Sequence, residues 1–226
     1  MCGRLNQHPD HAHSWREYRG FLELEIPRIN VAPTELLALI REGRVDLARW
    51  WLTPSWSDGP SQKYSMFNAR SEKLTQSPAF RGPFKSQRGI VPMSSFIEWR
   101  TSDGKKQPWS IHREGETLYA AALWDEWRGE SETLLSCTIV TTAAAKAFEP
   151  WHHRMPVLLE GEEVERWLDN NAIIAADDPV FAPCLKFAWK VNPLPTAVGN
   201  ARNKSAELME PVGDAVELDA EADPAA

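Results

Sequence analysis

Cys2 carries the most distinctive chemistry in the chain, because it directly follows the initiator Met1. Methionine aminopeptidases accept a small second residue, so we expect removal of Met1 to leave Cys2 with a free α-amine beside its own thiol. An α-amine with a pKa of about 8 is partly neutral at physiological pH and can condense with an aldehyde to an imine. A thiol with a pKa of about 8.5 can then attack the imine carbon and close a thiazolidine ring. We therefore expect Cys2 to form a stable covalent link to an aldehyde.

The two residues after Cys2 suit such a reaction. Gly3 leaves the backbone free to bring the start of the chain into a pocket. Arg4 can hold an anionic substrate with its guanidinium group. The alternative is that Cys2 is an incidental small residue near a frayed end, and the first four residues alone do not decide between the two.

The elements that must position this chemistry are mostly strands. Turn signals and alternating hydrophobic residues predict strands with a few short helices, without the regular strand–helix alternation of a doubly wound sheet. We expect an α+β fold, a single domain with a mainly antiparallel, strongly curved or barrel-like sheet. Residues 29–40 are expected to contain a turn marked by Pro33 followed by a strand. The other expected strands cover residues 44–52, 89–100, 107–113, 117–127 and 134–144, and the expected helices cover 13–24, 69–78, 143–148 and 160–169.

Length and cysteine content limit the class of protein. A chain of 226 residues fits one domain, and it has neither the ~20 consecutive apolar residues of a membrane span nor a secretory signal pattern. We expect a cytoplasmic protein. Cys2, Cys137 and Cys184 form no CxxC pair, so we expect reduced thiols, no metal and no cofactor.

Charge is unevenly distributed along the chain. The net charge of −7 at first argues against a polyanionic partner. Residues 214–226 contain several acidic residues and no Lys or Arg, so we expect a disordered acidic tail after a folded domain of residues 1–213. Between residues 63 and 106 basic residues prevail, which allows a local basic surface on the folded domain.

Six short motifs occur in order along the chain. The sequence reads MCGR at the start, INVAPT at 29–34, NARSEKL at 68–74, FIEW at 96–99, HHRMPVLL at 152–159 and AVGNARN at 197–203. In these motifs the sequence closely resembles the SRAP family, the SOS response-associated peptidase-like proteins that crosslink to abasic sites in single-stranded DNA. The resemblance implies the SRAP fold, single-stranded DNA with abasic sites as the partner, and association with the nucleoid when DNA is bound. We expect a monomer.

The resemblance assigns a catalytic role to three residues besides Cys2. Glu98 lies among Phe96, Ile97 and Trp99, where desolvation would raise its carboxyl pKa toward neutrality and suit it to acid–base catalysis. His152 corresponds to the family histidine that contacts the sugar and promotes ring opening. Asn68 offers an amide that can orient the amine or a sugar hydroxyl.

The resemblance also implies a set of DNA-binding residues. The guanidinium groups of Arg70 and Arg154 match family positions that grip phosphates, although structural ion pairs are the alternative. The aromatic ring of Trp56 can stack on an unpaired base. The expected DNA-binding residues are Arg4, Asn30, Pro33, Trp56, Arg70 and Arg154.

The chain departs from the family pattern at two places. His153 stands where the family usually has an Asp, and Met93, Ser94 and Ser95 replace a small-residue–Gly turn before the FIEW motif. The first change bears on the pKa of His152 and the second on the shape of the loop.

Two other functions fit the same residues. Cys2 could act as the nucleophile of a peptidase that removes Met1 from its own chain. The aromatic and basic residues could instead form a non-catalytic reader of single-stranded DNA. N-terminal mass analysis distinguishes the first alternative, and equal affinity for intact and abasic strands without a stable adduct would indicate the second.

Overall fold

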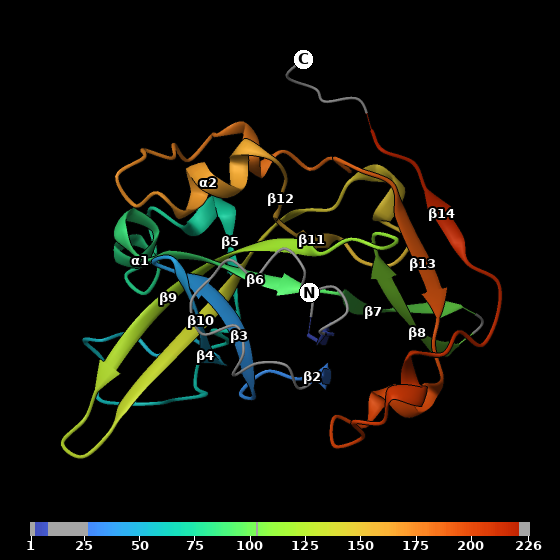
Figure 1. Ribbon diagram of the computed structural model, residues 1–226, viewed down its shortest axis with the longest axis horizontal. Coiled ribbons are helices and arrows are strands. Elements are labelled where there is room, and N and C mark those ends of the chain that lie inside the picture. The colour runs from blue at the N-terminus through green and yellow to red at the C-terminus, as the bar shows by residue number, and fades with distance from the viewer. Residues whose placement is uncertain (1–2, 9–26, 103, 222–226) are drawn as a thin grey trace.

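The strands β3, β4, β6, β9 and β10 close into a barrel (Figure 1). The computed structural model describes residues 3–8, 27–102 and 104–221. β10 pairs with β9 in antiparallel and with β4 in parallel orientation, and these two pairings complete the ring. The five strands are β3 (Leu36–Arg41), β4 (Arg44–Trp50), β6 (Arg88–Met93), β9 (Leu118–Arg128) and β10 (Thr133–Ala143). The expected barrel-like sheet in a single α+β domain is confirmed.

The hairpin of β3 and β4 shows how the local sequence specifies the barrel. Glu42 and Gly43 form its two-residue turn with φ of 49° and 71°, the left-handed conformation that matches the twist of paired strands. Gly43 takes this conformation without steric cost because it has no Cβ. The expected hairpin around these two residues is confirmed.

A second, antiparallel sheet packs beside the barrel and carries the start of the chain. Its strand order is β14–β13–β8–β7–β1–β2. The strands are β1 (Leu5–Gln7), β2 (Arg28–Val31), β7 (Ser95–Ser102), β8 (Lys105–His112), β13 (Trp189–Pro193) and β14 (Val216–Leu218). β1 lies between β2 and β7 and directly follows the MCGR motif, so Arg4, the last residue of that motif, lies next to Ile97 of the FIEW motif.

Three short strands flank the C-terminal end of β10 and the N-terminal end of β9. β5 (Asn68–Arg70) runs parallel to β10, β11 (Arg154–Pro156) runs antiparallel to it, and β12 (Leu158–Leu159) continues along β9. Thr141 of β10 is the register partner of both Arg70 and Pro156. The NARSEKL and HHRMPVLL motifs therefore meet across one strand.

Helices are short and lie outside the barrel (Figure 1). Trp167 of α2 is buried, and its indole donates to the Gly89 carbonyl at 2.8 Å. Arg88 is buried beneath α2 and donates to the Trp167 and Ala172 carbonyls at 2.8 and 2.9 Å, which satisfies backbone groups left open where the helix ends. The helices are α1 (Arg81–Ser86) and α2 (Glu162–Leu168), with 3₁₀ turns η3 (Ser71–Lys73), η4 (Lys146–Phe148), η5 (Pro179–Phe181), η6 (Thr196–Gly199) and η7 (Ala206–Met209).

Three expectations about secondary structure are wrong. The strand expected at 89–100 is two strands in different sheets, because the chain leaves the barrel after β6 and enters the second sheet as β7. Residues 69–78 do not form one helix, because Asn68–Arg70 pair with β10 and Ser71–Lys73 form only a 3₁₀ turn. The acidic segment is not disordered from residue 214, because Val216–Leu218 form β14 at the sheet edge and bury Leu218 to 9% exposure. Alternation of apolar and acidic residues here reflects a strand with one buried face.

Some expectations lie outside the described residues, namely the helix at 13–24, the Asp103 position of the β7–β8 turn, and residues 222–226. Within the described part of the chain, no helix is long and apolar enough to cross a membrane. The same part of the chain holds no cluster of three His, Cys, Asp or Glu side chains that could bind a metal.

Candidate functional site

Glu98 occupies the middle of β7 and is 4% exposed. Its register partner in β8 is Trp109, and directly opposed residues of an antiparallel pair project from the same face. Phe96 and Arg100, two residues away on either side, share this face because side chains alternate along a strand. Glu98 therefore projects from the same face of the sheet as the aromatic rings of Phe96 and Trp109.

Burial raises the pKa of the Glu98 carboxyl from its usual value to about 7. Removal from water penalises the charged form, so a large fraction of this carboxyl is neutral near physiological pH. The expected shift is confirmed, but Ile97 and Trp99 are not its cause as expected, because they project from the opposite face. There Ile97 packs with Leu194, Val198 and Leu208, and Trp99 contacts this cluster.

The start of the chain runs along β7 toward Glu98. Leu5 pairs with Phe96, and the Ile97 amide donates to the Arg4 carbonyl at 3.0 Å. This antiparallel register directs Gly3 toward the position of Glu98. The guanidinium of Arg4 is half-buried, donates to the Gly3 carbonyl at 2.8 Å and lies 5.9 Å from the centre of the Trp99 ring. Cys2 lies outside the described residues.

His152 precedes β11 and is held by the backbone of Arg154. Two backbone groups of Arg154 approach His152 Nδ1, the amide nitrogen at 2.8 Å and the carbonyl oxygen at 3.1 Å. Because an amide N–H can only donate, we assign Nδ1 as the acceptor of the shorter contact, which leaves the proton of the neutral ring on Nε2. Desolvation lowers the pKa of His152 to about 4, so the imidazole is neutral at pH 7. The His153 ring stacks on it with centroids 4.2 Å apart.

An aromatic contact joins the Glu98 strand to the His152 segment. Trp109, the partner of Glu98, meets Trp151 edge to face with centroids 6.0 Å apart. Arg100 lies 5.4 Å from the centre of the Trp151 ring. Since Trp151 directly precedes His152, this packing fixes the position of the His152 segment against the Glu98 face of the sheet.

Asn68 begins β5 and is 7% exposed, with Ile139 of β10 as its partner. It lines an open cavity of about 460 Å³ that also includes exposed basic side chains. The lining residues are Ser65, Asn68, Arg70, Lys73, Gln76, Ser77 and Phe80. Arg70 is thus exposed at a site that can accept an anion.

Arg154 and Asn30 serve as internal supports. Arg154 is 8% exposed and forms a forked ion pair with Glu72, at 2.6 and 3.0 Å, so the structural alternative for this residue is the one observed. Asn30 is fully buried, and its side-chain amide donates to the carbonyls of three residues of the AVGNARN motif, Val198, Asn200 and Asn203. In this conformation neither side chain is open to a DNA strand.

Pro33 and Trp56 are more accessible. Pro33 is half-buried in the turn between β2 and β3. Trp56 is 66% exposed, as is Tyr64, and both line a cavity of about 230 Å³ with Lys63 at its rim. The Lys63 ammonium lies 5.6 Å from the centre of the Tyr64 ring, so this cavity combines aromatic surface with positive charge.

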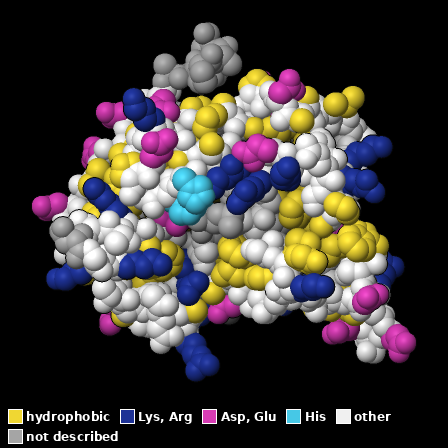
Figure 2. Space-filling view, turned by 180° about the vertical axis from the view of Figure 1, so that it is seen from behind, with side chains coloured by type: hydrophobic (Ala, Val, Ile, Leu, Met, Phe, Trp, Pro, Cys, Tyr) yellow, Lys and Arg dark blue, Asp and Glu magenta, His cyan; other side chains and the backbone are white. Residues whose placement is uncertain are grey.

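Figure 2 shows basic side chains gathered near histidine on one face of the molecule. Despite the net charge of −7, the protein therefore presents a local positive surface. Such a surface attracts a phosphate backbone at short range.

Comparison with known proteins identifies the family. Residues 1–201 match the family model described as SOS response associated peptidase (SRAP). The chain belongs to the SRAP family. The family match includes all six motifs except the last two residues of AVGNARN, and residues 202–221, with η7 and β14, extend beyond it.

Named SRAP relatives cover most of the chain. It is 37% identical to the abasic site processing protein YoqW of Bacillus subtilis over 196 residues, or 81% of this chain and 86% of the relative. It is 32% identical to the abasic site processing protein YedK of Escherichia coli over 237 aligned positions, or 94% of this chain and all of the relative. A crystal structure of a protein from Bacteroides thetaiotaomicron has the same fold, with a TM-score of 0.70, 21% identity, and coverage of 87% of this chain and 91% of that one.

Several residues of this candidate site were not anticipated from the sequence. Trp109, Trp151 and Glu72 lie in the contacts that join Glu98 and His152 to the rest of the fold. The acidic Glu72 within the basic NARSEKL motif, opposite the buried Arg154, was the only local signal for the ion pair. The contact between the two tryptophans depends on tertiary packing, which no local pattern reports.

Proposed function

We propose that this protein processes abasic sites in single-stranded DNA by forming a covalent thiazolidine link between Cys2 and the sugar aldehyde. The observation that carries the proposal is the buried Glu98, whose pKa is raised to about 7, on the strand along which the start of the chain runs. Cys2 directly precedes Gly3 in the sequence. The names of YoqW and YedK support the same substrate.

The first chemical step exposes the aldehyde. An abasic deoxyribose is mostly a closed ring, and opening it breaks the bond between C1′ and the ring oxygen. Glu98 in its protonated form donates to the ring oxygen, and the C1′ hydroxyl gives its proton to the resulting Glu98 carboxylate as the aldehyde forms, so Glu98 is protonated again. The Nε2–H of neutral His152 donates a hydrogen bond to a sugar oxygen, because its Nδ1 is engaged by Arg154.

The next steps form the link. The Cys2 α-amine attacks C1′ to give a carbinolamine, which loses one water to form the imine with Glu98 as proton donor. The Cys2 sulfur then attacks the imine carbon, the nitrogen takes up the thiol proton, and the ring closes. Asn68 orients the amine or the sugar hydroxyl through its amide. The whole reaction joins protein and DNA with loss of one water.

The DNA strand is held by charge and stacking. Arg70 and Lys73 line the cavity at Asn68 and contact phosphates, together with Arg4 near the reacting end. Trp56 stacks on an unpaired base, a contact worth about 1–3 kcal/mol. Pro33, in the turn between β2 and β3, lies beside the DNA that flanks the abasic site. Because Asn30 and Arg154 are buried, we assign them the support of this surface instead of direct contact.

A denaturing gel tests the proposal. Incubation with a single-stranded oligonucleotide that contains one abasic site should give a slower band for the wild type, and Cys2→Ser should give none. Glu98→Gln should form the same band more slowly, by about 10²-fold or more if it supplies general acid–base catalysis. An intact oligonucleotide is the matched control. An undiminished band with Cys2→Ser would remove Cys2 from the mechanism.

A further inference from the structure

Glu72 joins the two motifs that flank β10. It lies in η3, directly after β5, and its carboxylate accepts from Arg154 Nη1 at 2.6 Å and Nη2 at 3.0 Å. Arg154 Nη2 also donates to the Thr141 carbonyl at 2.6 Å. The Arg154 side chain is 9% exposed and that of Glu72 is 54% exposed. The ion pair therefore holds the first residue of β11 against β10 and η3.

The backbone of Arg154 in turn holds His152. Its amide is an obligatory donor, and its 2.8 Å hydrogen bond to His152 Nδ1 leaves the ring proton on Nε2. A displacement of Arg154 would lengthen this bond and free the ring to rotate or to change tautomer. The position of the Arg154 backbone thus decides which imidazole nitrogen can donate.

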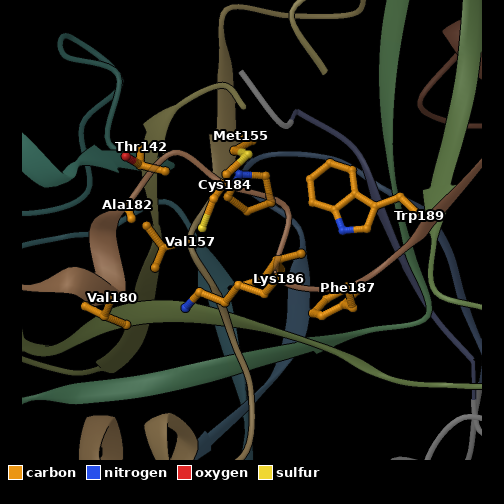
Figure 3. Close-up of a pocket in the computed structure, with 11 residues that line it drawn as sticks. Thr142, Met155, Val157, Val180, Ala182, Cys184, Lys186, Phe187 and Trp189 are labelled. Atoms are coloured by element: carbon orange, nitrogen blue, oxygen red, sulfur yellow. The ribbon is translucent and has the colours of Figure 1, made fainter. Parts of the chain in front are cut away.

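The opposite face of β11 has a separate anchor. Met155, the residue after Arg154, lies with Thr142 and Cys184 around a small internal cavity (Figure 3). The cavity volume is about 10 Å³, about the space for one water molecule, so it is not a substrate site. Because Met155 is fixed in the core, loss of the Glu72 ion pair should leave β11 in the sheet while freeing its Arg154 face.

We propose that Glu72 is a positioning residue, which acts through Arg154 to fix the orientation and the Nε2–H tautomer of His152. The proposal rests on the proposed function only for the consequence in the reaction with DNA. Hydrogen bonds from Arg154 lower the pKa of the Glu72 carboxyl, so the ion pair is formed at neutral pH. Arg70 is exposed on the same segment and remains available to DNA.

Nitrogen NMR of the histidine rings tests the proposal in the free protein. Long-range ¹H–¹⁵N spectra at pH 7 should show wild-type His152 as the Nε2–H tautomer, with assignment by His152→Asn. Glu72→Gln keeps the size of the side chain but loses the forked ion pair, and should give averaged shifts from both tautomers. Glu114→Gln, which removes the exposed ion pair with Lys190, should leave the His152 signals unchanged. Unchanged His152 signals in Glu72→Gln would overturn the proposal.

Crosslinking kinetics give the second readout. Glu72→Gln should slow adduct formation by about tenfold, part of the ~10²–10⁴ that a positioned proton-transfer group supplies. Glu72→Asp, which keeps the charge, should recover part of the rate and of the wild-type NMR pattern. A faster reaction in Glu72→Gln would mean that Glu72 competes with phosphate for Arg154, and an equal rate would mean no positioning role, so either overturns the proposal. If the wild type forms no adduct at all, the proposed function fails. The NMR comparison still tests whether Glu72 fixes the tautomer of His152.

Discussion

Trp109 and Trp151 meet edge to face, with ring centroids 6.0 Å apart and planes inclined by 83°. Trp109 is the register partner of Glu98, and Trp151 directly precedes His152. The contact therefore fixes the position of His152, in the segment before β11, relative to Glu98 in β7. Such pairs contribute about 0.5–1.5 kcal/mol beyond the area that they bury.

Removal of the Trp151 ring should weaken both the fold and the reaction. Trp151→Ala should lower the free energy of unfolding by about 3–5 kcal/mol, because the ring is 6% exposed and packs on Phe148 as well. Trp151→Phe keeps an aromatic ring and should cost less. Chemical denaturation measures the first effect, and crosslinking rates under conditions where both variants are folded measure the second. Wild-type rates in folded Trp151→Ala would show that this contact does not position His152.

Glu98 should make the protein less stable as pH rises. Its folded pKa of about 7 lies above the usual 4.5, so the folded state binds more protons between these values and stability falls across this window. Above pH 7 the raised pKa of Glu98 lowers the free energy of unfolding by its full amount, about 3 kcal/mol. Glu98→Gln should therefore be more stable than the wild type at pH 8 and similar to it at pH 4. Denaturation midpoints at both pH values check this, and parallel pH dependence of the two proteins would contradict a raised pKa.

His152 should remain neutral throughout the physiological range. Burial lowers its pKa to about 4, so the unfolded chain binds a proton between about pH 6.5 and 4 that the folded protein does not. Its contribution to stability should therefore decrease as pH falls through this window. NMR titration of the His152 ring, identified with His152→Asn, measures the pKa directly. A midpoint near 6.5 would show that the ring is as hydrated as in a free peptide.

Arg100 should bind a DNA phosphate beside the reaction site. It is exposed on the Glu98 face and lies 5.4 Å from the centre of the Trp151 ring, which holds the guanidinium in place. In the non-crosslinking Cys2→Ser background, Arg100→Gln should weaken binding and reduce the slope of log K against log salt by about 1.

The matched control is Arg128→Gln. Arg128 is 78% exposed at the far end of the β9–β10 hairpin, which projects from the barrel (Figure 1). Its substitution should leave the salt slope unchanged. Equal slopes for the Arg100 and Arg128 variants would exclude a phosphate contact by Arg100.

The sequence predicted those parts of the fold that local patterns encode. The β3–β4 hairpin follows from alternation and from the Glu42–Gly43 turn. The parallel pairing of Asn68 with Ile139 was missed, because it joins segments far apart in the chain and the local pattern after Asn68 suits a helix equally well. The strand at Val216–Leu218 was hidden by its acidic residues, whose charge suggested a solvated tail.

The candidate site was predictable in composition and less so in geometry. The motifs identified Glu98 and His152, and burial confirms the direction of the expected pKa shift at Glu98. Strand alternation and cross-strand register decide which rings desolvate Glu98. They place Trp109 on the face of Glu98, and Ile97 and Trp99 on the opposite face. Arg154 looked like a DNA contact because exposure cannot be read from the sequence, and its partner Glu72 is 82 residues away.

Intact-mass spectrometry under denaturing conditions, without a reducing agent for imines, tests the central claim most directly. After incubation with an abasic single-stranded oligonucleotide, the account predicts one adduct, with the mass of the chain without Met1 plus the oligonucleotide minus one water. Proteolysis should place the modification on the peptide that begins with Cys2. A chain that retains Met1 yet forms the adduct, or an adduct on any other residue, would contradict the account.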